Sequence, residues 1–175
     1  MSNQRYGIFE STHITGRNFS FVSDVDLENG MLVHKGELIP GSKDIYEALI
    51  PTAVTIANEP VFVVGNPAWN YDTSSKVNQN EDMYYIKAGK VFRVYELNRN
   101  DKFGIADYGI EGTPVVGQFV GLQAGSAKPV AAATAPNTAF VGKVIQEVDM
   151  GHEYFVGQTV DNRIKKIRIE VVNNG

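Results

Sequence analysis

The stretch that decides the fold class is IKKIRIEVV, residues 164–172. Apolar and charged side chains alternate in its second half: Ile167, Ile169 and Val171 against Arg168 and Glu170. Successive side chains of a β-strand point to opposite faces, so this stretch predicts a strand with one apolar and one solvated face. Such a strand is typical of an antiparallel barrel or sandwich, because the strands of parallel sheets are covered on both faces.

The rest of the chain repeats short runs of Val, Ile, Phe and Tyr that are separated by Gly, Pro, Asn and Asp. This pattern predicts strands and turns, and 17 glycines and 7 prolines leave little room for a long helix. The further strands are expected at residues 19–25, 31–35, 60–65, 91–97, 114–122 and 140–148. The sequence therefore predicts an all-β protein, built as a small antiparallel β-barrel or sandwich.

Two local features refine this prediction. Asn29–Gly30 accepts positive φ at low cost, so we expect the strands on either side of it to form a hairpin. Residues 44–50 fit either a short helix capped by Ser42 or a strand, and the surrounding β pattern favours the strand.

Length and composition limit the classes of function. A chain of 175 residues fits one domain, or one domain with an arm or subdomain, and is long enough to fold without a metal or a disulfide. It contains no cysteine, which removes disulfides, thiolate nucleophiles and zinc sites with sulfur ligands. Sixteen Lys and Arg against twenty Asp and Glu give a net charge of −4, and the longest basic cluster, residues 163–168, alternates with apolar residues. We therefore expect no nucleic acid as a partner, because such binding relies on concentrated basic charge.

A membrane partner is not expected either. No segment approaches the ~20 apolar residues of a membrane helix, and the opening MSNQRYG lacks the apolar run of a signal peptide. The sequence thus predicts a soluble protein that is made and folded in a cytosol.

The stretch most like a phosphate-binding loop is GLQAGSAK, residues 121–128. A P-loop needs G-x-x-x-x-G-K-[S/T] between a buried strand and a helix. Here Gly121 and Gly125 are one residue too close, Lys128 lies three residues past the second glycine, and Pro129 follows. We expect a bend between two strands instead. Residues 124–136 then predict a turn, a short strand and a loop, because prolines interrupt any helix there.

No metal or catalytic site is expected. The segment that begins at Asp24 imitates a calcium loop, but its sixth position is Asn29 and its twelfth is Lys35, instead of glycine and an acid. The three histidines show no metal-ligand spacing: His13, His34 and His152. No serine stands in a nucleophile elbow. The sequence therefore predicts neither an enzyme nor a cofactor.

Residues 66–82 are polar and predict a long exposed loop, a type of segment that is often functional. Trp69, the single tryptophan, stands there beside Tyr71. Exposed aromatic side chains anchor protein interfaces and stack on sugars. The alternative is that the tryptophan folds back and closes one end of the barrel.

The pieces YIKAGKVFRVYELNRNDKFGIA, GTPVVGQFVGLQAGSAKPVAA and FVGKVIQEV resemble small head decoration proteins, also called capsid cement proteins, of tailed bacteriophages. In such proteins an Ala-Gly pair precedes a strand, a short GD/ND-x-F step follows, and a G-x-x-V-x-L strand leads to a closing F-x-G-x-V strand. The corresponding positions here are residues 88–89, 100–103, 117–122 and 140–144. The opening NQRYGIFESTHITG also looks like the start of phage virion proteins. The resemblance covers about half of the chain.

The resemblance implies a small β-barrel on the outside of an assembled head, where it bridges neighbouring major capsid subunits. It implies no catalytic residue. Members often carry a flexible N-terminal arm along the shell, and the polar residues 1–18 suit that role, with Tyr6, Ile8 and Phe9 as expected capsid contacts.

The simplest members are shorter than this chain, which suggests a division into parts. We expect the barrel domain at residues 86–175 and an added β-hairpin lobe at residues 19–85, although residues 19–175 also suit one intertwined domain.

The resulting expectation is a structural virion protein on the capsid exterior, present in the host cytoplasm before assembly. Its expected partner is the phage major capsid protein, with neighbouring copies of itself as a second partner. Trp69 and Tyr71 are further expected contacts. The alternative is a carbohydrate-binding β module in which these two aromatic residues form the stacking platform.

Overall fold

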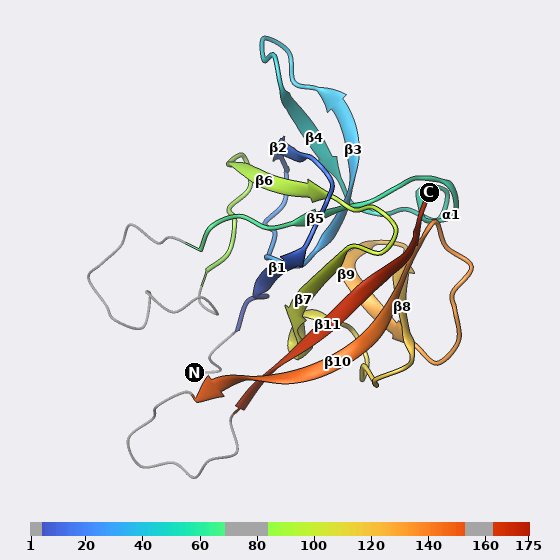
Figure 1. Ribbon diagram of the computed structural model, residues 1–175. Coiled ribbons are helices and arrows are strands. Elements are labelled where there is room, and N and C mark those ends of the chain that lie inside the picture. Colours follow the sequence, from blue (N-terminus) through green and yellow to red (C-terminus); the bar gives the residue numbers. More distant parts are fainter. Residues whose placement is uncertain (1–4, 69–83, 153–162) are drawn as a thin grey trace.

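The computed structural model describes residues 5–68, 84–152 and 163–175. These residues form a closed barrel of five strands and a separate sheet of six strands (Figure 1). The barrel strands are β2 (Asn18–Val22), β3 (Leu32–Leu38), β4 (Ile45–Leu49), β5 (Phe62–Val64) and β6 (Val91–Glu96). The sheet strands are β1 (Phe9–His13), β7 (Lys102–Ala106), β8 (Phe119–Gln123), β9 (Ser126–Ala132), β10 (Phe140–His152) and β11 (Arg163–Asn174). The helical elements are short: α1 (Thr55–Asn58) and the 3-10 turn η3 (Asp107–Gly109). The all-β prediction is confirmed.

The six-stranded sheet has the order β1-β7-β11-β10-β8-β9, and each of its neighbouring pairs is antiparallel. Its inner face follows the alternation seen in β11, where Ile167, Ile169 and Val171 are at most 1% exposed. Arg168 and Glu170 lie on the other face: the Arg168 guanidinium donates to Gln146 Oε1 (3.0 Å), and Glu170 pairs with Lys102. The alternation in the sequence therefore identified both faces of this strand.

The barrel interior is packed with aromatic rings. Phe19, Phe21, Tyr46 and Phe62 form one cluster, in which the ring centroids of Phe21 and Phe62 are 5.3 Å apart and those of Phe19 and Phe62 are 5.4 Å apart. Such pairs contribute about 0.5–1.5 kcal/mol each beyond the area they bury. β2 pairs antiparallel with β6 and parallel with β4, which closes the barrel.

The strand β5 is shared by the two hydrophobic cores. Phe62 and Val64 face the barrel interior, whereas Val61 and Val63 pack into the core between the barrel wall and the sheet. A strand that is buried on both faces needs a continuous apolar run, which explains why residues 61–64 show no alternation. This shared strand joins the two layers into one body.

Two polar side chains add to this connection. Asn174, near the end of β11, accepts a hydrogen bond from the Val61 backbone N–H (2.8 Å) and donates to the carbonyls of Val61 (3.0 Å) and Leu97 (2.9 Å). Asp101, which is 1% exposed, accepts from the backbone N–H of Thr15 (3.0 Å), the Thr15 hydroxyl (2.7 Å) and the Asn98 N–H (2.8 Å). Asn174 thus holds a sheet strand beside the residues that flank barrel strands β5 and β6, and Asp101 ties together the β1–β2 and β6–β7 connections, which both pass between the sheet and the barrel.

The strands lie close to their expected positions, but their pairing differs. The predicted hairpin between residues 19–25 and 31–35 is wrong, because β2 pairs with β4 and β6, and β3 with β4 and β5. The turn at Asn29–Gly30 does exist, with φ of +86° at Gly30. Leu27, however, bridges to Ile86 and draws the chain away from β2.

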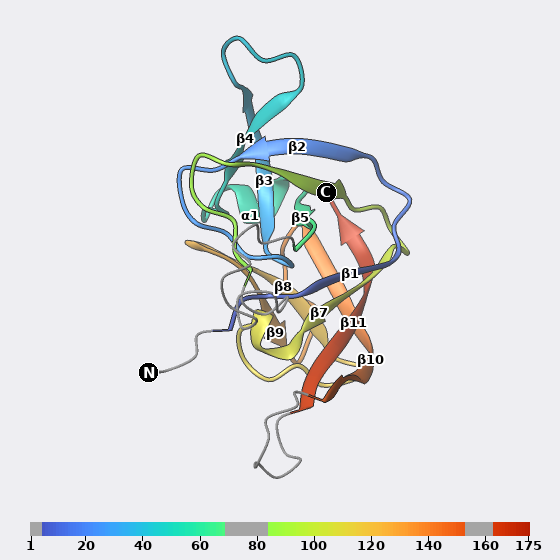
Figure 2. The same cartoon turned by 90° about the vertical axis from the view of Figure 1, so that its left-hand side faces the viewer.

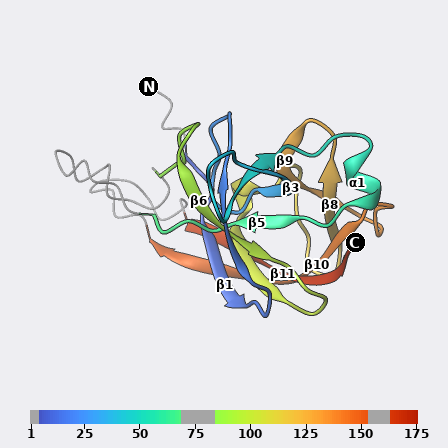
Figure 3. The same cartoon turned by 90° about the horizontal axis from the view of Figure 1, so that it is seen from above.

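The division of the chain also differs from the expected one. The structure places the closed barrel at residues 18–96, the part expected as a hairpin lobe. β6 lies beyond the expected boundary at residue 85, yet it pairs with β2 and β5, which lie before that boundary. The expected lobe and the expected barrel domain are therefore interleaved along the chain. Seen from above, α1 lies on the side of β8 and β9, away from β1 and β6 (Figure 3).

Candidate interaction surface

The N-terminal segment from residue 5 onward is built into the sheet and does not form a free arm. β1 pairs with β7, with Phe9 opposite Ile105 and Glu10 opposite Gly104. Ile8 is 8% exposed, and the Phe9 ring lies 5.5 Å from the Tyr95 ring and 6.1 Å from the Phe103 ring. The expectation of an extended arm is thus corrected for these residues. Its apolar residues gain more from burial in the sheet edge than from exposure on an arm.

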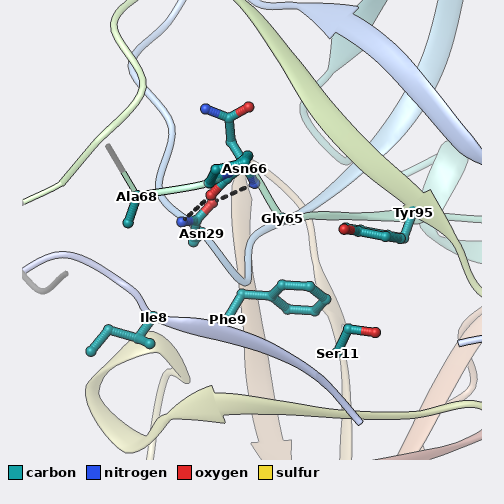
Figure 4. Close-up of a pocket in the computed structure, with 9 residues that line it drawn as sticks. Ile8, Phe9, Ser11, Asn29, Gly65, Asn66, Ala68 and Tyr95 are labelled. Atoms are coloured by element: carbon teal, nitrogen blue, oxygen red, sulfur yellow. Dashed lines mark hydrogen bonds between the residues drawn. The ribbon is translucent and has the colours of Figure 1, made fainter. Parts of the chain in front are cut away.

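A first pocket, which we call the Phe9 pocket, has a volume of about 240 Å³ (Figure 4). It is lined by Ile8, Phe9, Ser11, Asn29, Gly65, Asn66, Pro67, Ala68 and Tyr95. Gly65 is required here, because a Cβ at this position would lie 2.6 Å from both the Phe9 and the Tyr95 rings. The Asn29 side chain donates through Nδ2 to the Asn66 carbonyl and accepts the Asn66 N–H through Oδ1, both at 2.9 Å. The Phe9 and Tyr95 rings line this pocket together with polar residues, which include Ser11, Asn29 and Asn66, so its surface is mixed in character.

A second pocket, the tyrosine pocket, has a volume of about 370 Å³ and is lined by Tyr6, Asp26, Leu27, Glu28 and Tyr85. The two tyrosine rings are stacked, with centroids 4.7 Å apart and an angle of 28° between their planes. Leu27, 1% exposed, exchanges two backbone hydrogen bonds with Ile86 at 2.9 and 2.8 Å, which fixes the position of the pocket.

The two pockets share no lining residue, but neighbouring residues of the same two chain segments, 6–11 and 26–29, line them. The Gly7 N–H, between Tyr6 and Ile8, donates to Glu28 Oε2 (2.8 Å) and joins the two segments. Of the expected contacts, the structure therefore places Tyr6 in one pocket and Ile8 and Phe9 in the other. The three residues line pockets of the folded body, and their role as capsid contacts stays a prediction.

A feature that the sequence analysis missed is the hairpin between β3 and β4, whose outer part, residues 38–45, we call the hairpin tip. It projects from the body in Figures 1 and 2. The Ser42 hydroxyl accepts from the N–H groups of Asp44 (3.2 Å) and Ile45 (2.9 Å), and the Ile39 N–H donates to the Ile45 carbonyl (2.9 Å). Leu38 is nevertheless 43% exposed. The sequence signal was present in Pro40-Gly41-Ser42, a turn flanked by apolar residues.

The remaining expected contacts, Trp69 and Tyr71, lie outside the described residues, as does most of the expected loop 66–82. The stretch at residues 121–128 is a bend, as predicted: β8 and β9 form a hairpin around Gly125, whose φ is +82°.

The histidines are not brought together. His13 is exposed in β1, and the side chain of His152 lies outside the described part of the chain. His34 is completely buried, and its Nδ1 donates to the Pro60 carbonyl (3.0 Å). In the ranges that the structure describes, no group of three or more His, Asp or Glu residues is placed to hold a metal ion.

Lys166, part of the basic cluster, has an unusual environment for a lysine. It is 8% exposed, its stem lies over Gly104, and its ammonium group contacts the Glu10 carboxylate two strands away. Burial lowers the pKa of Lys166, and the nearby Arg168 lowers it further. The Lys166–Glu10 contact thus reaches across β7 and ties β1 to β11 on the outer face of the sheet.

Comparison of the chain with family models, curated proteins and solved structures finds no match. Among the described residues, no helix has the length and apolar character needed to cross a membrane.

Proposed function

We propose that this protein is a structural virion protein that binds the outer surface of an assembled phage capsid and stabilises the head by bridging major capsid subunits. The observation that carries this proposal is the hairpin tip. The tip is a two-stranded projection whose turn is closed by the hydrogen bonds of the Ser42 hydroxyl, and it carries one exposed large apolar side chain, that of Leu38. A projection with a hydrogen-bonded turn and an exposed leucine is suited to contact with a partner, because a turn that is already ordered loses less conformational freedom on binding.

The Phe9 and tyrosine pockets support the same proposal. A body with a projecting tip and two receiving pockets presents separate contact regions. Once one region has bound, the other contacts form within the same complex and benefit from a high effective concentration. A site that presents all partners together exists only on an assembled lattice.

Stabilisation of the head then follows from mass action. A protein that binds the assembled form alone stabilises it by RT ln(1 + [L]/Kd), which is about 2.7 kcal/mol per site when its free concentration is a hundred times Kd. Because many such sites cover a head, no chemical step is needed for a large total effect.

Co-sedimentation tests the proposal. The purified protein is mixed with emptied heads of a phage that carries its gene, and separately with unassembled capsid subunits. Saturable binding to heads and weak binding to free subunits are expected. Equal binding to both, or no binding to heads, would contradict the proposal. A glycan array run in parallel examines the carbohydrate alternative, which depends on Trp69 and Tyr71.

A further inference from the structure

The tyrosine pocket combines two kinds of group that act together on cations. Tyr6 and Tyr85 provide stacked ring faces, and Asp26 and Glu28 provide carboxylates at the same cavity. The face of an aromatic ring carries partial negative charge and attracts ammonium and guanidinium groups. Leu27, which also lines the pocket, is 1% exposed.

The carboxylates retain accepting capacity. Asp26 uses Oδ1 to accept the Ala88 N–H (2.9 Å), and Glu28 uses Oε2 to accept the Gly7 N–H (2.8 Å). An ionised carboxylate has about four lone-pair positions, so each of these groups can take a further donor. The backbone bonds also hold both side chains in place, which reduces what must be ordered on binding.

Charge near the pocket favours Asp26 as the main ion partner. Lys128 Nζ lies 3.6 Å from Glu28 Oε2 and balances part of that carboxylate's charge. Asp26 is exposed at the rim, and no lysine or arginine pairs with it among the ion pairs of the described residues. A cation that lies on a tyrosine ring can therefore reach an uncompensated carboxylate.

We propose that the tyrosine pocket binds a guanidinium group, with its plane on a tyrosine ring and its N–H groups directed to Asp26. Guanidinium fits better than ammonium because it is planar, stacks on aromatic rings and donates in a fork that matches a carboxylate. The natural source of this guanidinium group would be an arginine side chain of the capsid subunit, and this part of the inference rests on the proposed function. The binding chemistry itself belongs to the isolated protein.

The test uses the full-length protein and a small probe. Tyrosine-ring NMR signals are followed while ethylguanidinium chloride is added, at concentrations that leave the far-ultraviolet circular dichroism unchanged. Ethylurea serves as the neutral planar control, and sodium chloride controls for ionic strength. Saturable shifts of the Tyr6 and Tyr85 signals are expected with ethylguanidinium alone.

Variants connect the response to the pocket. Asp26→Asn keeps an oxygen for the Ala88 N–H and is expected to weaken probe binding about fivefold, since charge-assisted hydrogen bonds are roughly twice as strong as neutral ones. Tyr85→Leu should remove saturable binding. The matched control is Asp44→Asn, the same change on the hairpin tip, with unchanged binding.

Equal responses to ethylurea and ethylguanidinium would overturn the inference. So would an Asp26→Asn protein that binds the probe as well as the wild type. Neither result depends on heads, so failure of this site and failure of capsid binding are separate outcomes.

Discussion

Replacing Asp101 by asparagine examines how the barrel and the sheet are held together. The substitution preserves shape but removes the charge and turns one oxygen into a donor. The amide oxygen can still face the two donors of Thr15, whose bonds to the carboxylate are 3.0 and 2.7 Å long. The amide NH₂ must then face the Asn98 N–H, which now donates to Asp101 Oδ2 at 2.8 Å.

The expected loss follows from these three bonds. A hydrogen bond to a charged group contributes about 1.5–3 kcal/mol, and a buried donor left without an acceptor costs about 1–3 kcal/mol. With one bond lost and two weakened, we expect the free energy of unfolding to fall by about 3 kcal/mol. In a domain of this size that corresponds to a decrease in Tm of about 6–12 °C.

Urea unfolding followed by circular dichroism measures this loss. Asp44→Asn is the control, because it makes the same change at an exposed position and should stay within about 0.5 kcal/mol of the wild type. If Asp101→Asn is as stable as this control, the hydrogen bonds of Asp101 do not hold the two layers together and the reasoning is refuted.

The remaining predictions concern packing, charge and binding. Gly142→Ala places a Cβ 2.5 Å from a methyl group of Ile169 in the core. It should lower the free energy of unfolding, measured in urea, by about 1–3 kcal/mol. Gly104→Ala is the control and should cost less, because its Cβ displaces only the flexible stem of Lys166. Burial lowers the pKa of Lys166 in the folded protein, so between that pKa and 10.5 the unfolded chain binds more protons than the folded one. The free energy of unfolding of the wild type should therefore rise with pH in this window relative to that of Lys166→Met. A difference between the two proteins that does not change with pH would contradict the lowered pKa. Leu38→Asp should weaken co-sedimentation with heads at least tenfold without lowering Tm, whereas Val54→Asp, at a position 74% exposed just before α1, should leave binding unchanged. Equal effects of the two substitutions would remove the hairpin tip from the contact surface.

Strand positions were predictable because they depend on local patterns. The alternation in β11 and the apolar run of β5 each report the environment of a single strand. Pairing was less predictable, because it depends on partners far away in the sequence. β2 pairs with β6, more than 60 residues later, and β1 pairs with β7 across an even longer separation. No turn motif in the sequence near β2 predicts the β2–β6 pairing or the β1–β7 pairing.

The candidate interaction surface was likewise only partly predictable from the sequence, because it depends on residues far apart in the chain. Tyr6, Ile8 and Phe9 were chosen for their aromatic and apolar character in a polar segment, and those properties also drive burial. Their role as pocket walls depends on Tyr85 and Tyr95, which the sequence places far from them. The hairpin tip, by contrast, is local, and its turn residues were visible in the sequence.

Rigidity connects the fold to the proposed binding. Contacts made through the hairpin tip and through the pockets reinforce each other only if their separation is fixed, because a flexible connection lowers the effective concentration of the second contact. The tip extends from the barrel, whereas Phe9 belongs to β1 of the sheet. Asn174, Asp101 and the shared strand β5 fix these parts against each other. A variant such as Asp101→Asn should therefore weaken binding to heads even where it remains folded, although Asp101 itself lies in neither the tip nor the pockets.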